Sequence, residues 1–349
     1  MIAPIGQIVL ILVALPIVHF MPRRVRLLFL SVMGSVVLLF TSAASFWIVL
    51  FTIFEGLILE RSLRSLPRNS MWRQYLPYVL LLNVFTSDLA NGPFARHNFA
   101  TLGVAFAVVR VFMTTKQLLA GNTVLRQRWL SMAAGGFFLP VLSVGPVFSG
   151  TTLWSQSDKD ETALGATETM YRMLFGGWIL SALMSQWMAQ LADNPHLDRW
   201  TAPFVVLGLF GFLFFSFWGQ SLIAQAGAAL AGFSIPQNFD KPWLASDIRD
   251  FWNRWHMSMS KFVTQYIFIP LNLRGVKPKV ATIVAFEFMG LWHEVKWGYV
   301  IWGLVHGAMM AFAPKSADIK RRSLRVVNRI ATIGLVVMTS YVANYAFKI

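Results

Sequence analysis

Cysteine is absent from this sequence of 349 residues, and charged residues make up only 13% of it. Without cysteine, the chain can form no disulfide, no thiolate metal site and no cysteine nucleophile. The charged fraction is about half of the roughly 25% that is typical of soluble domains, which argues against a soluble fold. Any covalent chemistry must therefore use other side chains, in a largely apolar setting.

Hydrophobic residues, by contrast, make up 56% of the chain, and its mean hydropathy is +0.58. Residues 202–239 contain no Asp, Glu, Lys or Arg, and this run exceeds the roughly 20 residues that cross about 30 Å of hydrocarbon. Backbone groups in lipid must be paired within the protein, and long apolar runs without period-two alternation favour helices over strands. We therefore predict an all-α polytopic membrane protein with roughly nine to eleven spanning or re-entrant helices in one membrane domain, residues 1–349.

The sequence carries 30 lysines and arginines against 15 acidic residues, a net charge of +15. Arginines cluster within residues 23–26 and again within residues 61–73. The positive-inside bias predicts that both connections are cytoplasmic, which places the N-terminus outside. A basic cytoplasmic face would also attract an acidic donor, such as a coenzyme A thioester or an acidic carrier protein. Both interpretations can hold together.

Apolar runs between such connections predict the order of the segments. Residues 132–150 contain two prolines and several glycines, which suit a broken or re-entrant helix buried in protein better than a smooth span. Residues 156–168 predict an acidic surface loop, and residues 170–191 predict an interfacial or tilted helix. The remaining apolar segments are residues 5–20, 27–40, 44–59, 75–85, 98–113, 202–239, 262–273, 280–293, 297–312 and 330–346.

Residues 240–261 form an abruptly polar stretch between two apolar segments. On one continuous helix, Trp252, His256 and Ser260 would share a stripe at i, i+4 and i+8. Asp250 and Arg254 would pair at i, i+4 on another face. His256 would then face inward, beside aromatic and hydroxyl groups. The alternative is an interfacial helix whose Trp and Arg side chains anchor it among lipid headgroups.

Two further histidines follow. His293 ends an apolar run, and an ionisable group in a spanning segment is costly enough to suggest a function. An imidazole can take and return a proton near neutral pH, as transfer of an acyl group to an alcohol requires. A structural or interfacial role is the alternative for His293. For His306, beside Gly307 on the next predicted helix, we favour structural packing.

These residues resemble the two signature regions of the membrane-bound O-acyltransferases. The first region is DFWNRWHMS at residues 250–258 with YIFIPL at 266–271, and the second is GLWHEVKW at 290–297 with WGLVHG at 302–307. The nearest branch contains proteins of alginate O-acetylation, peptidoglycan O-acetylation and D-alanylation. Weaker similarities lie at FLP (138–140), GP (145–146), IPQNFDKPW (235–243) and PRR (22–24).

The resemblance implies a helical core around a transmembrane tunnel over residues 130–349, with residues 1–129 as peripheral N-terminal helices. It assigns the invariant histidine of the family, the general base, to His293 and an upstream assisting position to His256. The donor would be an acyl-CoA or acyl-carrier-protein thioester, with acetyl as the favoured acyl group. The acceptor would be hydroxyls of an extracytoplasmic polysaccharide or partner protein. The positions expected to line the tunnel or position substrate are Trp252, Asn253, Arg254, Ser260, Trp292 and Glu294.

The same resemblance implies a multi-pass protein of the bacterial cytoplasmic (inner) membrane that works with an extracytoplasmic acyltransferase-like partner protein. We expect no bound metal or cofactor and no nucleic-acid partner. The chain departs from the branch after His293, where Glu294 and Lys296 place two charges beside the expected base. These charges can pair with each other or act on His293. Without cysteine, an acyl-enzyme would need Ser or Tyr, and Tyr341 and Tyr345 are the speculative candidates.

Two other functions stay open from the sequence. The first keeps the enzyme but moves D-alanine from a carrier protein toward teichoic acid. The second is a non-enzymatic, proton-coupled transporter whose buried histidines relay protons.

Overall fold

The computed structural model describes residues 13, 17–18, 20–85, 99–121, 125–157, 165–192, 202–314, 318–319 and 322–343. In these ranges every regular element is a helix, which confirms the predicted all-α class. The chain divides into two compact units, one of Met1–Ile179 with Gly219–Pro236 and one of Leu180–Trp218 with Gln237–Ile349. The prediction of a single membrane domain with a boundary near residue 130 stays a prediction.

Within the described residues, four helices are long and apolar enough to cross a membrane, and they coincide with predicted apolar runs. They are α2 (Arg23–Thr41), α3 (Ala43–Leu63), residues 103–120 of α6 (Phe99–Ala120) and α11 (Ala202–Leu230). Shorter apolar helices are α16 (Trp297–Phe312) and residues 326–341 of α17 (Arg322–Tyr341). Together with the family match reported below, these helices identify a membrane protein. The predicted first span, residues 5–20, lies largely outside the described residues.

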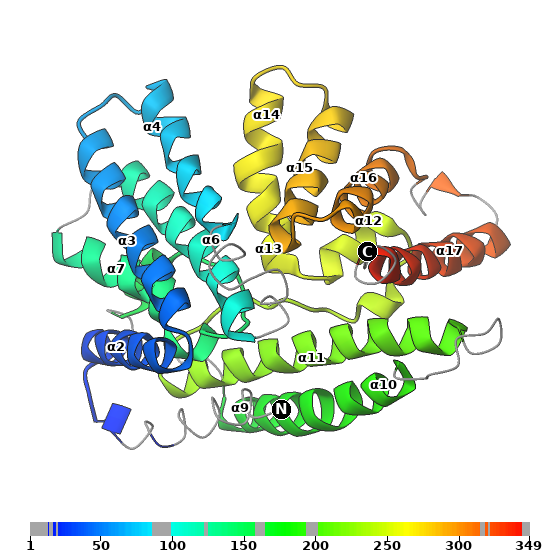
Figure 1. Ribbon diagram of the computed structural model, residues 1–349, viewed down its shortest axis with the longest axis horizontal. Coiled ribbons are helices and arrows are strands. Elements are labelled where there is room, and N and C mark those ends of the chain that lie inside the picture. Colours follow the sequence, from blue (N-terminus) through cyan, green and yellow to red (C-terminus); the bar gives the residue numbers. More distant parts are fainter. Residues whose placement is uncertain are drawn as a thin grey trace. The chain divides into compact units, whose positions relative to one another are not determined.

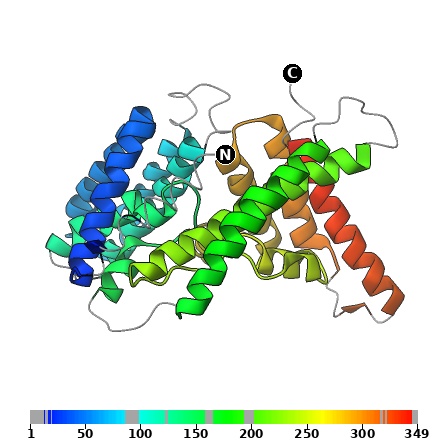
Figure 2. The same cartoon turned by 90° about the horizontal axis from the view of Figure 1, so that it is seen from below.

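In the first unit, α3 packs against α6 and α7 (Leu125–Phe137) (Figure 1). Residues 75–85 differ from the predicted span, because α4 (Met71–Tyr75) is followed by a short 3-10 helix, η1 (Leu76–Leu82), with a proline at its start. Proline lacks the N–H that a continuing α-helix needs there. The predicted tilted segment 170–191 is a continuous helical stretch made of α9 (Ala166–Tyr171), the π-helix η4 (Arg172–Met184) and α10 (Ser185–Ala192) (Figure 2).

The predicted break within residues 132–150 is confirmed and buried. Helix α7 ends at Phe137, a 3-10 turn (η3) spans Leu139–Val141, and α8 spans Gly150–Gln156. The end of α7 leaves carbonyl groups without a helical partner. The fully buried Arg110 of α6 donates from Nε to the carbonyl of Gly135 at 2.8 Å. A cation at a helix C-terminus also complements the helix dipole.

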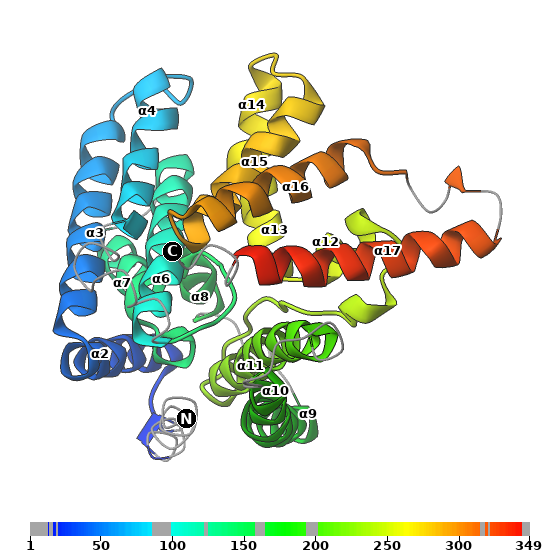
Figure 3. The same cartoon turned by 45° about the vertical axis from the view of Figure 1, so that its right-hand side comes forward.

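The second unit holds a run of helices between residues 242 and 341. In chain order they are η5 (Pro242–Leu244), α12 (Ile248–Arg254), α13 (Met257–Val263), η6 (Thr264–Phe268), α14 (Ile269–Leu273), α15 (Pro278–His293), α16 and α17. Helices α16 and α17 meet near the C-terminal end of α17 and diverge from there (Figure 3), and a hydrogen bond joins His306 to Thr339. Among the described helices, α15 and α16 pack against each other most extensively.

Glycines allow α15 and α16 to approach so closely. A Cβ atom at Gly290 would collide with the carbonyl oxygen of Tyr299, and one at Gly307 would lie 2.8 Å from the Cα of Ile283. Small residues at such crossings let helix backbones pack in direct contact, which is a main source of helix association in membranes. This packing holds the ends of both helices, and the histidines on them, in a defined register.

We expect Gly290→Ala to destabilise the protein by about 1–3 kcal/mol, because the new methyl group forces the two backbones apart. The matched control is Gly334→Ala in α17, where a Cβ atom meets nothing within 4 Å. That control should be neutral or stabilising by up to about 1 kcal/mol, since alanine favours a helix over glycine. Thermal unfolding in detergent measures both variants, and equal behaviour would contradict the close packing.

The start of α12 is fixed by carboxylates. Asp247 caps the helix, accepting from the backbone N–H of Arg249 and of Asp250 at 3.0 Å each. Asp250 pairs with Arg254 at 2.7 Å, which confirms the predicted i, i+4 pair. Burial alone would raise the pKa of Asp250, but hydrogen bonds from the Ser246 N–H and the Arg254 guanidinium, with the charge of Arg254, leave that pKa below its ordinary 3.8.

Asp250→Asn tests this pair through its pH dependence. A carboxyl whose folded-state pKa is lowered stabilises fully above its unfolded pKa, near 3.8, and loses that contribution as pH falls through the folded value. At pH 7 we expect the variant to be less stable by about 0.5 kcal/mol, as for partly exposed pairs of this spacing. This difference in stability should narrow once the pH falls well below 3.8 and the carboxyl becomes protonated in the folded protein. The measurement is the unfolding midpoint of the wild-type protein and the variant at both pH values. A difference in stability that does not change with pH would contradict the charge-based account.

Candidate active site

The predicted continuous helix through residues 250–260 is wrong, because the chain leaves the helix at Trp255. Helix α12 ends at Arg254, and His256 has a left-handed backbone (φ 42°, ψ 50°) before α13 begins. Such a conformation is uncommon for a residue other than glycine and costs of order 1 kcal/mol. Trp252, His256 and Ser260 therefore share no helical stripe.

Residues 238–240 stabilise this break from outside the helix. The carbonyl of Asn238 accepts the N–H of Met257 at 3.0 Å, and the N–H of Asp240 donates to the carbonyl of Arg254 at 2.9 Å. The Asn238 side chain also accepts a 2.6 Å hydrogen bond from the hydroxyl of Ser258. Backbone groups that the break would strand in a buried region are thus paired.

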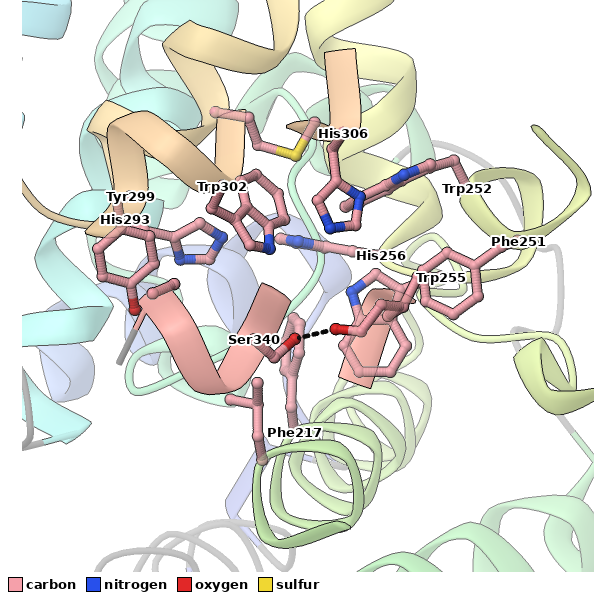
Figure 4. A pocket seen from close by; sticks show the side chains of 14 residues that line it. Phe217, Phe251, Trp252, Trp255, His256, His293, Tyr299, Trp302, His306 and Ser340 are labelled. Carbon is pink, nitrogen blue, oxygen red and sulfur yellow. Dashed lines mark hydrogen bonds between the residues drawn. The ribbon is translucent and has the colours of Figure 1, made fainter. Parts of the chain in front are cut away.

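A cavity of about 80 Å³ lies beside the break, within the second unit. Its walls come from α11, α12, α15, α16 and α17, and three histidines line it, His256, His293 and His306 (Figure 4). His256 is 2% exposed, and its ring meets Phe217 edge-on at 4.8 Å between centroids. His293, at the end of α15, stacks on Tyr299 at 5.4 Å. Tertiary packing thus brings the two histidines expected to carry chemistry into one enclosed space.

The other residues predicted for the site divide into two groups. Trp252 lines the cavity, with its ring edge-on to Trp302 at 5.7 Å between centroids. Trp292 is buried next to the rings of His256 and His293, at 6.2 and 4.9 Å, but does not line the cavity.

Four predicted positions lie away from the cavity lining. Asn253 is exposed, and Arg254 is held by Asp250. The hydroxyl of Ser260 donates to the carbonyl of Trp252 at 3.1 Å. Glu294 pairs with Lys296 at 2.5 Å, one of the two outcomes expected for these charges. Two neighbouring opposite charges largely offset each other's field at the adjacent His293.

The cavity also contains residues that the sequence pattern did not select. His306 lines the cavity, and its side chain is 0% exposed. The structural packing expected from the sequence therefore describes only part of its environment, because the side chain also borders the cavity. Ser340 of α17 lines it too, with its hydroxyl donating to the carbonyl of Val336 at 2.8 Å (Figure 4). The i, i+4 register of His306 with Trp302 was a usable signal, since both lie on one face of α16.

Tyr341, one of the two speculative acyl carriers, ends α17 and does not line the cavity, and Tyr345 lies outside the described residues. Within the described ranges, no group of three or more His, Asp or Glu side chains is placed to hold a metal ion.

Comparison with known proteins adds to this geometry. Residues 128–319, more than half of the chain, match the MBOAT family, the membrane-bound O-acyltransferases. The "Teichoic acid D-alanyltransferase" of Streptococcus thermophilus is 35% identical over 38% of this chain and 34% of the relative. The "Probable alginate O-acetylase AlgI" of Pseudomonas syringae pv. tomato is 28% identical over 74% and 51%. The "Peptidoglycan O-acetyltransferase" of Helicobacter pylori is 36% identical over 28% and 19%.

The chain thus spans about half, or less, of the length of these relatives. The matched residues include α12 to α16, and with them all three histidines of the cavity. The signature motifs, the helical fold and this match agree, and the chain belongs to the membrane-bound O-acyltransferase family.

Proposed function

We propose that this protein is an O-acyltransferase that moves an acyl group, most simply acetyl, from a cytoplasmic thioester across the membrane to hydroxyls of an extracytoplasmic polysaccharide or partner protein. One observation carries the proposal: His256 and His293 line a single buried cavity in the family-matched part of the chain. The names of relatives, an alginate O-acetylase and a peptidoglycan O-acetyltransferase, favour acetyl as the group and a glycan as the acceptor.

In the proposed reaction, His293 acts as general base. It takes the proton of the acceptor hydroxyl while the oxygen attacks the thioester carbonyl carbon. The tetrahedral intermediate then collapses, the C–S bond breaks, and His293 returns the proton to the leaving thiolate. His256 donates a hydrogen bond to the carbonyl oxygen, where negative charge develops, and such help is strong in an enclosed apolar site. With substrate bound, the aromatic walls would restrict the access of bulk water and so limit hydrolysis of the thioester.

The donor would be an acyl-CoA or an acyl-carrier-protein thioester, both acidic, approaching the basic cytoplasmic face of a chain whose net charge is +15. We place the protein in the bacterial cytoplasmic membrane, with an extracytoplasmic acyltransferase-like protein as partner. Trp252 completes the proposed site as a wall of the cavity.

D-alanyl transfer from a carrier protein is the second candidate function, favoured by the similarity to a teichoic acid D-alanyltransferase. An acidic carrier needs a docking surface, so carrier binding that weakens with rising salt would favour this candidate. A proton-coupled transporter, the remaining alternative, would move solute into liposomes without consuming thioester. Membership of an acyltransferase family speaks against it.

His293→Ala should lower acyl transfer at least about hundredfold, because general base catalysis contributes 10²–10⁴-fold. His256→Ala should lower it less, since it removes an assisting hydrogen bond. The readout is the acyl content of the surface polymer in cells that depend on the variant. Val280→Ala, on the same helix and 49% exposed, is the control for expression and folding. Undiminished acylation with His293→Ala would refute the assignment of the base.

A further inference from the structure

The cavity wall includes buried polar atoms that lack hydrogen-bond partners within the described part of the chain, and a pair of them lies on neighbouring rings. This pair consists of Nε1 of Trp252 and Nδ1 of His306. Trp252 is 4% exposed and His306 is 0% exposed, and both line the cavity. Buried polar groups in proteins are nearly always paired with protein, water or ligand. These two atoms therefore point to a polar group that occupies the cavity.

Thr339 defines what His306 offers to that group. The hydroxyl of Thr339 has one hydrogen, which it donates within α17 to the carbonyl of Leu335 at 2.7 Å. The 2.8 Å contact between the same hydroxyl and Nε2 of His306 therefore has the histidine as donor. In a neutral imidazole with its hydrogen on Nε2, the other nitrogen, Nδ1, is an acceptor. The indole nitrogen of Trp252 can only donate.

One donor and one acceptor thus lie side by side. The Trp252 and His306 rings are 5.4 Å apart between centroids, at 81° to each other (Figure 4). A hydroxyl group between them can accept from the indole and donate to the imidazole. A carbonyl oxygen could use only the indole, and an ammonium group only the imidazole, so a hydroxyl fits the pair best. A cavity of about 80 Å³ exceeds the space that one water molecule needs.

The pair is close to the proposed base. Trp302 contacts His306 at 4.4 Å and His293 at 5.8 Å between ring centroids, so both imidazoles border the same indole. A hydroxyl bound to Nδ1 of His306 donates its proton to that nitrogen. It is therefore not the hydroxyl that His293 deprotonates. The bound hydroxyl and the reacting hydroxyl are therefore different groups of one acceptor.

We infer that Trp252 and His306 bind a second, non-reacting hydroxyl of the acyl acceptor, which makes the site selective for polyhydroxylated acceptors such as sugar units. The inference rests on the proposed function and deepens it. A site built to hydrogen-bond a hydroxyl discriminates strongly against an analogue that lacks it. A serine hydroxyl of a protein acceptor, which has no neighbouring hydroxyl, would lose this contact.

The test compares two small acceptors, 1,2-ethanediol and ethanol, with purified full-length protein and acetyl-CoA. The measurement is kcat/KM for transfer to each. We expect the wild-type protein to prefer the diol by about ten- to a hundredfold, as for loss of one buried hydrogen-bonded group. Trp252→Phe, which keeps an aromatic ring but removes the N–H, should bring this ratio close to one.

His306 is tested with two amides that replace different ring nitrogens. His306→Gln places an amide near Nε2, keeping the bond to Thr339, and should lose the preference for the diol. His306→Asn places an amide oxygen near Nδ1 and should restore part of it. A residue that served packing alone would not separate the two variants in this way. Trp297→Phe, at a tryptophan that is 75% exposed, is the matched control and should keep the wild-type ratio.

The outcomes distinguish failure of the proposed function from failure of the hydroxyl site. Transfer by wild-type protein to neither alcohol, to no larger glycan acceptor and to no hydroxyl of a partner protein would overturn the proposed function. Transfer to alcohols without preference for the diol, or a preference that survives both Trp252→Phe and His306→Gln, would overturn only the hydroxyl site. In that case the two nitrogens would bind water alone.

Discussion

The cavity in the second unit depends on the hydrogen bonds that join residues 238–240 to the residues at the helix break between α12 and α13. Two backbone hydrogen bonds, from Met257 to Asn238 and from Asp240 to Arg254, let the chain leave the helix without stranding polar groups. In a buried, apolar region such groups would otherwise cost several kcal/mol each. Because the chain turns there, His256 takes a left-handed backbone and lines the cavity instead of lying on a helical stripe.

The opposite wall depends on how closely two helices can pack. Glycines at the crossing bring α15 and α16 into backbone contact, so His293 at the end of one helix and His306 within the other border the same tryptophan, Trp302. Helix α17 adds Ser340 to the wall. It is held to the end of η5 by Arg329, whose guanidinium donates to the carbonyl groups of residues 244 and 245. Three separate helices, α15, α16 and α17, thus supply this wall of the cavity, and contacts outside the cavity hold each of them in place.

The proposed chemistry uses the contrast between this apolar wall and its few polar atoms. A base, an assisting imidazole and a donor–acceptor pair are enclosed by aromatic rings, where hydrogen bonds are stronger than in water and competing water is limited. The charges nearest to His293 are balanced locally, because Glu294 and Lys296 pair with each other. The proposed acyl transfer therefore relies on proton movement and positioned hydrogen bonds.

By itself, the sequence determined the all-helical membrane class, the main spans, the broken segment near Pro140, the Asp250–Arg254 pair and the two histidines most worth testing. Those features follow from hydropathy, proline and glycine content and i, i+4 spacing, all of which are local. Only the tertiary structure decided that the helix breaks at His256, that Asn253 and Glu294 lie away from the cavity, and that His306 lines it. The physical reason is that hydrogen bonds with residues 238–240 override the helical periodicity of residues 250–260. In addition, side chains converge on a cavity through contacts between distant segments, which no local pattern contains.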